Sequence, residues 1–360
     1  MSGPLNGIRI VEFEGIGPAP YCCMLLADMG AEIVRIARPS VARGPLIPEA
    51  GGAPIDRGRK VVTLDLKSEA GLDCARNLMA RADGVVEGLR PGVMERLGLG
   101  PDQAMQANPA LVYCRITGWG QEGPWASTAG HDLCYIALSG ALAAIGEPGR
   151  PPVPPLNLVG DYGGGGLFAA FGMVSALLHA RITGQGQVVD AAMLDGAASQ
   201  MTMIQGMLGQ GLWSLDRGQN FLDGAAPFYR CYTCLDGKFL AVGCIEPQFF
   251  VAFMQGIGLD PAAWDQADKA TWPDLADAVA RVLATRTRDE WAERFDGSDA
   301  CVAPVLDMVE APCHHHNQER KSFVGSPAHP APAPRMPGLN IGAGASASVS
   351  VDDVLADWSA

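Results

Sequence analysis

Two groups of acid and base residues stand in long stretches that otherwise carry no charge. Residues 151–180 carry one formal charge, Asp161, which is followed after Tyr162 by four glycines. Residues 123–146 carry one imidazole and one carboxylate, the adjacent His131 and Asp132. Desolvation disfavours the charged forms of such groups, so they are rarely left unpaired in apolar surroundings. The pattern indicates an acid/base centre in a dry cleft.

The competing interpretation is a helix N-cap at each place, because an Asp side chain accepts hydrogen bonds from the first N–H groups of a helix. Either group alone would favour the cap. Two such groups, each beside glycines that permit close approach of the backbone, favour the chemical site.

The composition is that of an acidic globular enzyme. A chain of 360 residues can bury a large core and is expected to form two domains or one large one. The net charge of −13 argues against nonspecific binding to nucleic acids or anionic membranes, so an anionic ligand needs a local basic patch. No signal peptide is apparent and the ten cysteines are scattered. We therefore expect reduced thiols and a cytoplasmic protein.

One uncharged run, residues 163–180, approaches the length of a transmembrane helix. It begins with four glycines and lies between Asp161 and Arg181. We therefore predict a buried core helix and no membrane insertion.

Strand and helix signals alternate through the first 120 residues. Apolar runs predict strands at 9–13, 32–36, 60–66, 84–87 and 111–115. Helices are expected near 21–29 and 69–82, and Ser68 is predicted to cap the second. The first strand, helix and strand form a βαβ unit. Two longer helices are expected, one after Asp132 and one from about Asp161 to Ala180, with a further strand at 188–191. This order predicts a doubly wound, mostly parallel, Rossmann-like α/β domain.

A change in composition indicates a second, small α+β domain. Asp236 and Gly237 separate two strand-like runs and predict a hairpin. The boundaries that we predict are a large domain at 1–191, a linker helix and loop at 192–227, a small domain at 228–312 and a return linker at 313–329. The large domain is rejoined by about 330–360, with a terminal helix at 351–358.

Several weaker signals are discounted. Gly15 and Gly17 lack the third glycine of a dinucleotide fingerprint, whose place is taken by Pro20. Cys231 and Cys234 form a single CxxC without a second pair, which does not indicate zinc. The run 314–316 of three histidines is interpreted as an exposed loop. We expect no metal site.

Several segments carry a resemblance to a known family. They are residues 115–121, 129–132, 151–161, 187–193 and 243–249. In order and content they resemble the α-methylacyl-CoA racemase branch of the family III CoA-transferase superfamily, from Gly3 to about Pro337. The resemblance implies an acyl-CoA substrate and an interlocked homodimer, in which each subunit passes through a ring made by the other.

The resemblance also implies roles for particular residues. His131 and Asp161 would alternate as base and acid on the two faces of the carbon next to the thioester carbonyl. Glu246 would hydrogen-bond to His131, from the partner subunit of an interlocked dimer. The backbone N–H of Asp132, at the start of a helix, is a candidate to stabilise the enolate oxygen, while its side chain caps or orients.

Coenzyme A carries phosphates, and basic residues gather where ligands of doubly wound sheets bind. They are Arg35, Arg38, Arg57, Arg59, Lys60, Lys67, Arg90 and Arg96. The resemblance carries substrate contacts onto a larger set: Arg38, Leu64, Asp65, Leu66, Lys67, Gly88, Leu89, Arg90, Arg96, Gly130, Leu133, Cys134 and Tyr135. Leu89 departs from the aromatic residue common in relatives. The methionines of 193–207 could meet an acyl chain or simply fill a helix core.

The function that these features predict is interconversion of (2R)- and (2S)-2-methylacyl-CoA thioesters without a metal or redox cofactor. One alternative is a family III CoA-transferase with Asp161 as covalent nucleophile. The other is a noncatalytic acyl-CoA binding protein. Trapping of Asp161 by hydroxylamine would favour the transferase, and absence of α-deuterium exchange would favour the binding protein.

Overall fold

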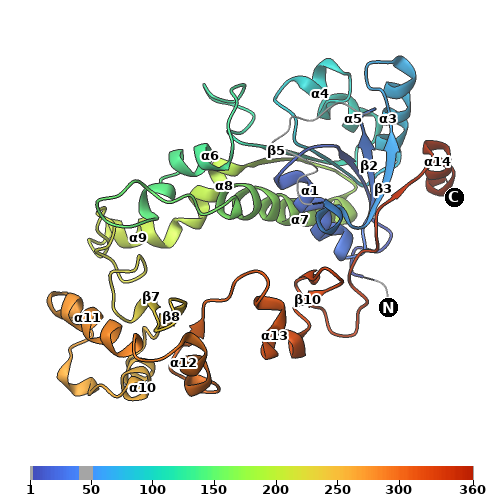
Figure 1. Ribbon diagram of the computed structural model, residues 1–360. Helices are drawn as coiled ribbons and strands as arrows, with labels where there is room; N and C mark the ends of the chain where they lie inside the picture. Colours follow the sequence, from blue (N-terminus) through green and yellow to red (C-terminus); the bar gives the residue numbers. More distant parts are fainter. Residues whose placement is uncertain (1–2, 40–51, 360) are drawn as a thin grey trace. The chain divides into compact units, whose positions relative to one another are not determined.

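The computed structural model describes residues 3–39 and 52–359 and divides into two compact units (Figure 1). Unit 1 consists of Met1–Leu142, Pro154–Thr202 and Phe323–Ala360. Unit 2 consists of Ala143–Val153 and Met203–Ser322. The first unit is therefore built from three separate pieces of the chain.

Unit 1 is organised around a seven-stranded sheet in the order β12-β3-β2-β1-β4-β5-β6, and its described pairings are parallel. The strands are β1 (Arg9–Phe13), β2 (Glu32–Ala37), β3 (Arg59–Thr63), β4 (Gly84–Glu87), β5 (Val112–Thr117), β6 (Val188–Ala192) and β12 (Ala347–Ser348). The order reverses between β1 and β4, as in doubly wound sheets. The predicted mostly parallel α/β architecture is confirmed.

Helices cover both faces of this sheet, because the strands are apolar on both sides. On one face, α1 (Pro18–Asp28) and α7 (Phe168–Thr183) pack against the sheet, and the side chains of Cys114 and Ile116 point to this face. The second face packs on residues of α3, α4, α5 and α14, with the side chain of Tyr113 among them. These helices are α3 (Glu69–Arg81), α4 (Val93–Arg96), α5 (Pro101–Ala107) and α14 (Val351–Ser359), and a short helix, α2 (Gly52–Asp56), precedes β3.

The helix boundaries follow local chemistry where the sequence contains a cap. The hydroxyl of Ser68 accepts a hydrogen bond from the N–H of Gly71 at the start of α3, as predicted. Gly184, in the left-handed conformation with φ 75°, ends α7. The backbone N–H of Gly184 donates to the carbonyl of Ala180.

The predicted helix from about Asp161 to Ala180 is in fact two elements. A π-helix, η2 (Leu158–Leu167), precedes α7, and the N–H of Tyr162 donates to the carbonyl of Asn157 five residues earlier. The glycines at 163–166 permit this wide turn because they let neighbouring backbones approach closely. The expected helix after Asp132 is short, α6 (Asp132–Leu138).

The segment Leu158–Thr183 is long and apolar enough to cross a membrane by length and composition alone, and 39% of its most apolar window is buried. The prediction of a buried core helix is correct for one face only. Ala169, Met173 and Leu177 face the core, whereas Phe171 and Ile182 are exposed.

The C-terminal part of the chain returns to unit 1. Ala347 pairs with Lys60 to add β12 at the edge of the sheet, and α14 packs against α3 (Figure 1). The carboxylate of Asp28 accepts a hydrogen bond from the N–H of Ala343 and forms an ion pair with the Arg57 guanidinium. The C-terminal segment is therefore bound to this ion pair. A two-stranded ribbon of β10 (Phe323–Val324) and β11 (His329–Pro330) precedes it.

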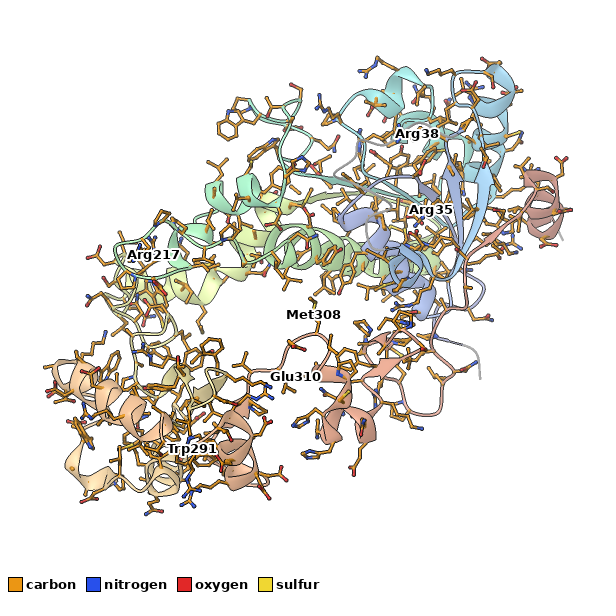
Figure 2. The ribbon with its side chains drawn as sticks, viewed as in Figure 1. Arg35, Arg38, Arg217, Trp291, Met308 and Glu310 are labelled. Carbon is orange, nitrogen blue, oxygen red and sulfur yellow. The ribbon has the colours of Figure 1, made fainter. Side chains whose placement is uncertain are left out.

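Unit 2 contains a three-stranded antiparallel sheet and several helices. Its strands are β7 (Tyr229–Thr233), β8 (Phe239–Gly243) and β9 (Val302–Pro304), and its helices include α9 (Thr202–Gly209), α10 (Pro247–Ile257), α11 (Trp272–Leu283), α12 (Arg288–Phe295) and α13 (His315–Arg320). The predicted hairpin at Asp236 and Gly237 is confirmed, with Gly237 at φ 75°. The core is rich in aromatic rings. Buried Arg288 binds Glu310, which Figure 2 labels.

The segment predicted as a linker helix, from residue 192, begins with α8 (Met193–Gln200), which belongs to unit 1. It packs directly on η2, because Gly164 and Gly196 bring the two backbones into contact. The apolar stretch 193–212 is therefore divided into α8 and α9 rather than forming one helix.

Candidate active site

A cavity of about 460 Å³ opens in unit 1 at the carboxyl ends of β1, β4 and β5. This is the place where ligands bind to doubly wound sheets. Its lining includes glycines and prolines, several aromatic rings, one Arg, one His and one Asp. The lining residues are Ile16, Gly17, Pro18, Ala19, Ile55, Gly88, Leu89, Arg90, Pro91, Ile116, Thr117, Gly118, Trp119, Ala126, Thr128, Ala129, Gly130, His131, Tyr135, Asn157, Asp161, Tyr162 and Met193. The two acid/base candidates therefore share one cavity.

His131 is the N-cap residue of α6 and is exposed. Its backbone is extended, and its carbonyl accepts hydrogen bonds from the N–H groups of Cys134 and Tyr135. The imidazole makes no cap hydrogen bond. The side chain is thus available to the cavity while its backbone is fixed by the helix.

Asp161 lies on η2 and is partly buried. Its carboxylate accepts a hydrogen bond from the amide of Asn157 at 3.3 Å, and its backbone N–H donates to the carboxylate of Asp132 at 2.7 Å. Burial raises the pKa of Asp161, and the nearby Asp132 carboxylate raises it further. The hydrogen bond from Asn157 and the charge of His131 act in the opposite direction. Asp161 is therefore suited to hold or release a proton.

Asp132 is buried, and its side chain orients the segment that carries Asp161. Its Oδ2 accepts the N–H of Asp161, while Oδ1 has no hydrogen-bond partner within residues 3–39 and 52–359. Gly160 allows this approach, because a Cβ there would lie 2.6 Å from Oδ2 of Asp132. The carboxylate of Asp132 thus holds the backbone of Asp161 in place.

The position of Asp161 depends on glycines. A Cβ on Gly164 would lie 2.8 Å from the backbone nitrogen of Ala197 and 2.9 Å from the carbonyl oxygen of Met193. Gly17, at φ 70°, places its backbone so close that a Cβ would lie 3.1 Å from the Asp161 carboxylate. The π-helix, α8 and the loop before α1 are therefore fitted together around this carboxylate.

An aromatic wall forms another side of the cavity. Trp119 makes edge contacts with Trp125 and Tyr135 at centroid distances of 4.9 and 4.8 Å. Gly118 and Gly130 leave no room for a Cβ beside the Tyr135 ring. Burial raises the pKa of Tyr135 to about 12, so its hydroxyl remains protonated at neutral pH. Trp119 was not predicted as a site residue, although it lies in a segment that carries the family resemblance.

Tyr162 and Asn157 were also not predicted as site residues. Tyr162 stacks on Tyr21 of α1 with ring centroids 4.5 Å apart, which fixes its ring beside Asp161. Asn157 lies four residues before Asp161 in the sequence, and Tyr162 directly follows it. Their closeness to Asp161 in the sequence was the signal that could have identified them.

The predicted coenzyme A residues are only partly brought together. Gly88, Leu89, Arg90, Gly130 and Tyr135 line the cavity. The remaining ones, Arg38, Leu64, Asp65, Leu66, Lys67, Arg96, Leu133 and Cys134, do not line it. Arg38, which Figure 2 labels, follows β2. The Nε of Arg38 lies 3.7 Å from Oε2 of Glu14.

The prediction that the early basic residues form one ligand patch is wrong for four of them. Arg59 and Lys60 lie at the start of β3, not at its carboxyl end. Arg59 is buried against Glu12, Arg35 binds Glu12 and Asp56, Arg57 binds Asp28, and Lys60 binds Glu32. The three arginines neutralise the buried carboxylates of Glu12 and Asp28, because buried charges require partners. The pair of Lys60 and Glu32 is partly exposed.

Glu246 belongs to unit 2, where it is the exposed N-cap residue of α10. Its carbonyl accepts the N–H groups of Phe249 and Phe250. It does not line the cavity of unit 1. Its role toward His131 stays a prediction.

The described residues contain no group of three or more His, Cys, Asp or Glu side chains arranged to hold a metal ion. The interpretation of 314–316 as a loop is wrong: His314 is the N-cap residue of α13, and His315 and His316 are its first two residues. The rings of His314 and His315 stack on each other.

Replacement of Asn157 by Ala is expected to change the pH dependence of the site. The amide of Asn157 lowers the pKa of Asp161, so its loss raises that pKa further. Steps that require the carboxylate form will then fail at a higher pH. On the base role predicted for Asp161 from the sequence, we expect the acidic limb of the kcat/KM profile to move to higher pH for the enantiomer that it deprotonates. The limb for the other enantiomer should move less. An unchanged limb for both would contradict the assignment.

The family model of CoA-transferase family III matches residues 5–346. The chain belongs to CoA-transferase family III. Among curated proteins, this family III chain is 45% identical to α-methylacyl-CoA racemase of Mus musculus over 92% of its length and 85% of the relative's. It is 44% identical to α-methylacyl-CoA racemase of Homo sapiens, over 92% of the chain and 86% of the relative.

More distant members of family III are named as transferases. The chain is 29% identical to succinyl-CoA–D-citramalate CoA-transferase of Chloroflexus aurantiacus, over 89% of the chain and 83% of the relative. A solved CaiB/BaiF family protein of Brucella suis shares the fold with a TM-score of 0.81 and 24% identity, covering 99% of this chain and 100% of that one.

Proposed function

We propose that this family III protein is a racemase that interconverts (2R)- and (2S)-2-methylacyl-CoA thioesters. The observation that carries the proposal is the placement of His131 and Asp161 in the lining of one cavity at the sheet's carboxyl edge. Identities of 45% and 44% to two proteins named α-methylacyl-CoA racemase support the same activity.

The chemistry requires one group to remove the proton next to the thioester carbonyl and another to deliver a proton to the opposite face. By family analogy, His131 takes the proton of the (2S) form and Asp161 that of the (2R) form. The two side chains come from different elements, α6 and η2, so they can approach a bound carbon from two directions. Because only protons move, the reaction needs no redox cofactor.

The enolate formed between the two steps needs hydrogen-bond donors on its oxygen. The N–H of Asp132 is our candidate, since it begins α6 next to His131. Asp132 itself does not line the cavity, but its sequence neighbours Gly130, His131 and Tyr135 do. We propose that Arg90, which lines the cavity, faces the phosphates of coenzyme A, and that Arg38, Arg96 and residues 64–67 extend this contact outside the cavity.

The identity of the relatives favours a racemase over a transferase. The named racemases are 45% and 44% identical to this chain, and the named transferases of Chloroflexus aurantiacus are 28–29% identical. A transferase using Asp161 as nucleophile would not need a second acid/base group, whereas His131 lines the same cavity.

Incubation of (2S)-2-methylacyl-CoA in D2O tests the function. We expect deuterium at the α-carbon together with loss of chirality, measured by mass spectrometry and chiral chromatography. A protein that binds the thioester without either change would be a binding protein. Transfer of coenzyme A to a free carboxylic acid, with hydroxylamine trapping at Asp161, would identify a transferase.

We also propose that the protein is an interlocked homodimer, with unit 2 as a separate small domain. An apolar stripe runs along one exposed face of η2 and α7, at the spacing of helical turns. Its residues are Leu167, Phe171, Val174, Leu178 and Ile182, with Phe171 74% and Ile182 75% exposed. A contiguous exposed apolar stripe of this kind indicates a protein interface. A second copy would cover it and supply Glu246 to His131.

Replacement of Phe171 by Glu is expected to produce monomers, because it places a charge in the stripe. Racemase activity should fall together with the dimer, since Glu246 would then be missing from the site. Sedimentation velocity and an activity assay at matched concentrations measure both. The control is Asn77→Glu on the exposed polar face of α3. This variant should sediment with the mass of the wild-type assembly. An active Phe171→Glu monomer would contradict the shared site.

A further inference from the structure

One buried carboxylate holds the turn that forms a wall of the cavity. Glu87, the last residue of β4, is completely buried. Its Oε2 accepts the backbone N–H of Leu89 at 2.7 Å, and its Oε1 accepts the Nε–H of Arg115 at 3.1 Å. The turn that begins here carries Gly88, Leu89, Arg90 and Pro91, and all four line the cavity.

Arg115 joins this carboxylate to a second one beyond the turn. It lies opposite Glu87 on the neighbouring strand β5. Its Nη1 binds Oε1 of Glu95 on α4 at 2.8 Å, and its side chain is 9% exposed. The Nη2 group is buried and has no hydrogen-bond partner in the described part of the chain. The guanidinium of Arg115 on β5 thus connects the end of β4 to α4, on the two sides of the turn.

We propose that Arg115 is a positioning residue that, through Glu87 and Glu95, fixes the turn 88–91 and α4 and so places Arg90 and Arg96 for an anionic ligand. Neither Arg115 nor Glu87 lines the cavity. The ligand, the phosphate-bearing end of a coenzyme A thioester, rests on the proposed function, but the positioning does not.

Stability alone gives a weak reason for this ion pair. A buried ion pair loses hydration, and a well-packed apolar pair of similar volume is often as stable. Burial raises the pKa of Glu87 despite its hydrogen bonds to Leu89 and Arg115. The pair is expensive in desolvation, yet it supplies what an apolar pair cannot, a carboxylate that accepts the N–H of Leu89. The planar guanidinium is needed because it reaches two carboxylates from fixed directions.

Hydrogen exchange in the unliganded full chain tests the positioning directly. In Arg115→Met, amides of residues 88–96 should exchange about tenfold faster, because a charge-assisted hydrogen bond is lost. Amides in the buried half of α7 should exchange at the wild-type rate. Arg76→Met is the matched control, since Arg76 also bridges two carboxylates, Glu69 and Asp73, but on the exposed face of α3. It should leave residues 88–96 unchanged.

Steady-state kinetics supply the second measurement. Arg115→Met should raise KM for an acyl-CoA about tenfold while kcat stays within about twofold. The KM for the matching acyl-pantetheine thioester, which lacks the nucleotide, should not change. Arg115→Lys should recover part of the affinity. Equal KM increases for both thioesters, or unchanged exchange at 88–96, would overturn the proposal.

A uniform acceleration of exchange across unit 1 would also overturn it, because Arg115 would then act on stability alone. If Arg115→Met does not fold, Glu95→Gln removes only the partly exposed anchor on α4. Exchange should then accelerate about threefold in 93–97. Unchanged exchange there would contradict the positioning role of Arg115. Should the wild-type protein show no racemisation, the proposed function fails while the exchange measurements still decide the positioning.

Discussion

Asp161→Asn should exchange the α-proton of the (2S) thioester while leaving its chirality almost unchanged. On the roles that we propose, His131 still removes that proton and returns deuterium to the same face, whereas the donor on the opposite face is lost. We expect racemisation to fall by roughly 10²–10⁴-fold, as is typical for loss of an acid/base group. His131→Ala should show the reverse pattern, with exchange and retention for the (2R) thioester. Time courses of mass and chirality in D2O measure both.

The experiment has an activity control and a stability control. Asp102→Asn, in the first turn of α5, changes a carboxylate that does not line the cavity and should be as active as the wild type. Asp161→Asn should also be at least as stable as the wild type at neutral pH. A carboxyl whose pKa is raised by burial destabilises the fold once pH exceeds that pKa. Loss of exchange for both enantiomers in both variants would contradict the division of roles.

Gly196→Ala should reduce kcat by about 100-fold with a much smaller change in KM. A Cβ at this position would collide with the backbone of Gly164, so α8 and η2 must separate. Asp161 lies on η2, and a displacement of about 1 Å can cost 10²-fold in rate. The free energy of unfolding should also fall by about 1–3 kcal/mol, as expected for overpacking. Kinetics at saturating substrate and urea denaturation measure the two effects.

Gly206→Ala is the matched control for this variant. Gly206 also lies in a short helix, α9, but a Cβ there meets nothing within 4 Å. The replacement should leave kcat unchanged and raise helix stability by up to about 1 kcal/mol. Equal kcat values in the two variants would show that the contact between Gly164 and Gly196 does not position Asp161.

The sequence predicted the strands of the parallel sheet well, because each is a short apolar run bounded by polar or glycine-rich turns. The strand at 84–87 and the cap at Ser68 are confirmed. The π-helix was not predicted, since its glycines have no side-chain periodicity and its hydrogen bonds depend on the helix packed against it. β12 was not predicted either, because Ala347 and Ser348 become a strand only by pairing with β3.

For the candidate site, charged residues in uncharged stretches were an informative signal. His131 and Asp161 were selected on that basis and line one cavity. The basic residues were less informative, because a cation such as Arg59 looks the same in sequence whether it binds a ligand or a buried Glu12. Glu87 and Arg115 were not selected, since their relation depends on which strands are neighbours.

The pairing of β12 with β3 has a consequence for biosynthesis. The sheet begins with residue 9 and gains its last edge only when residues 347 and 348 have left the ribosome. Until then, unit 2 emerges as an insertion within an unfinished fold, and Asp28 lacks its contact with Ala343. In the interlocked dimer that we propose, one nascent subunit would therefore have to thread through the other before this final docking step.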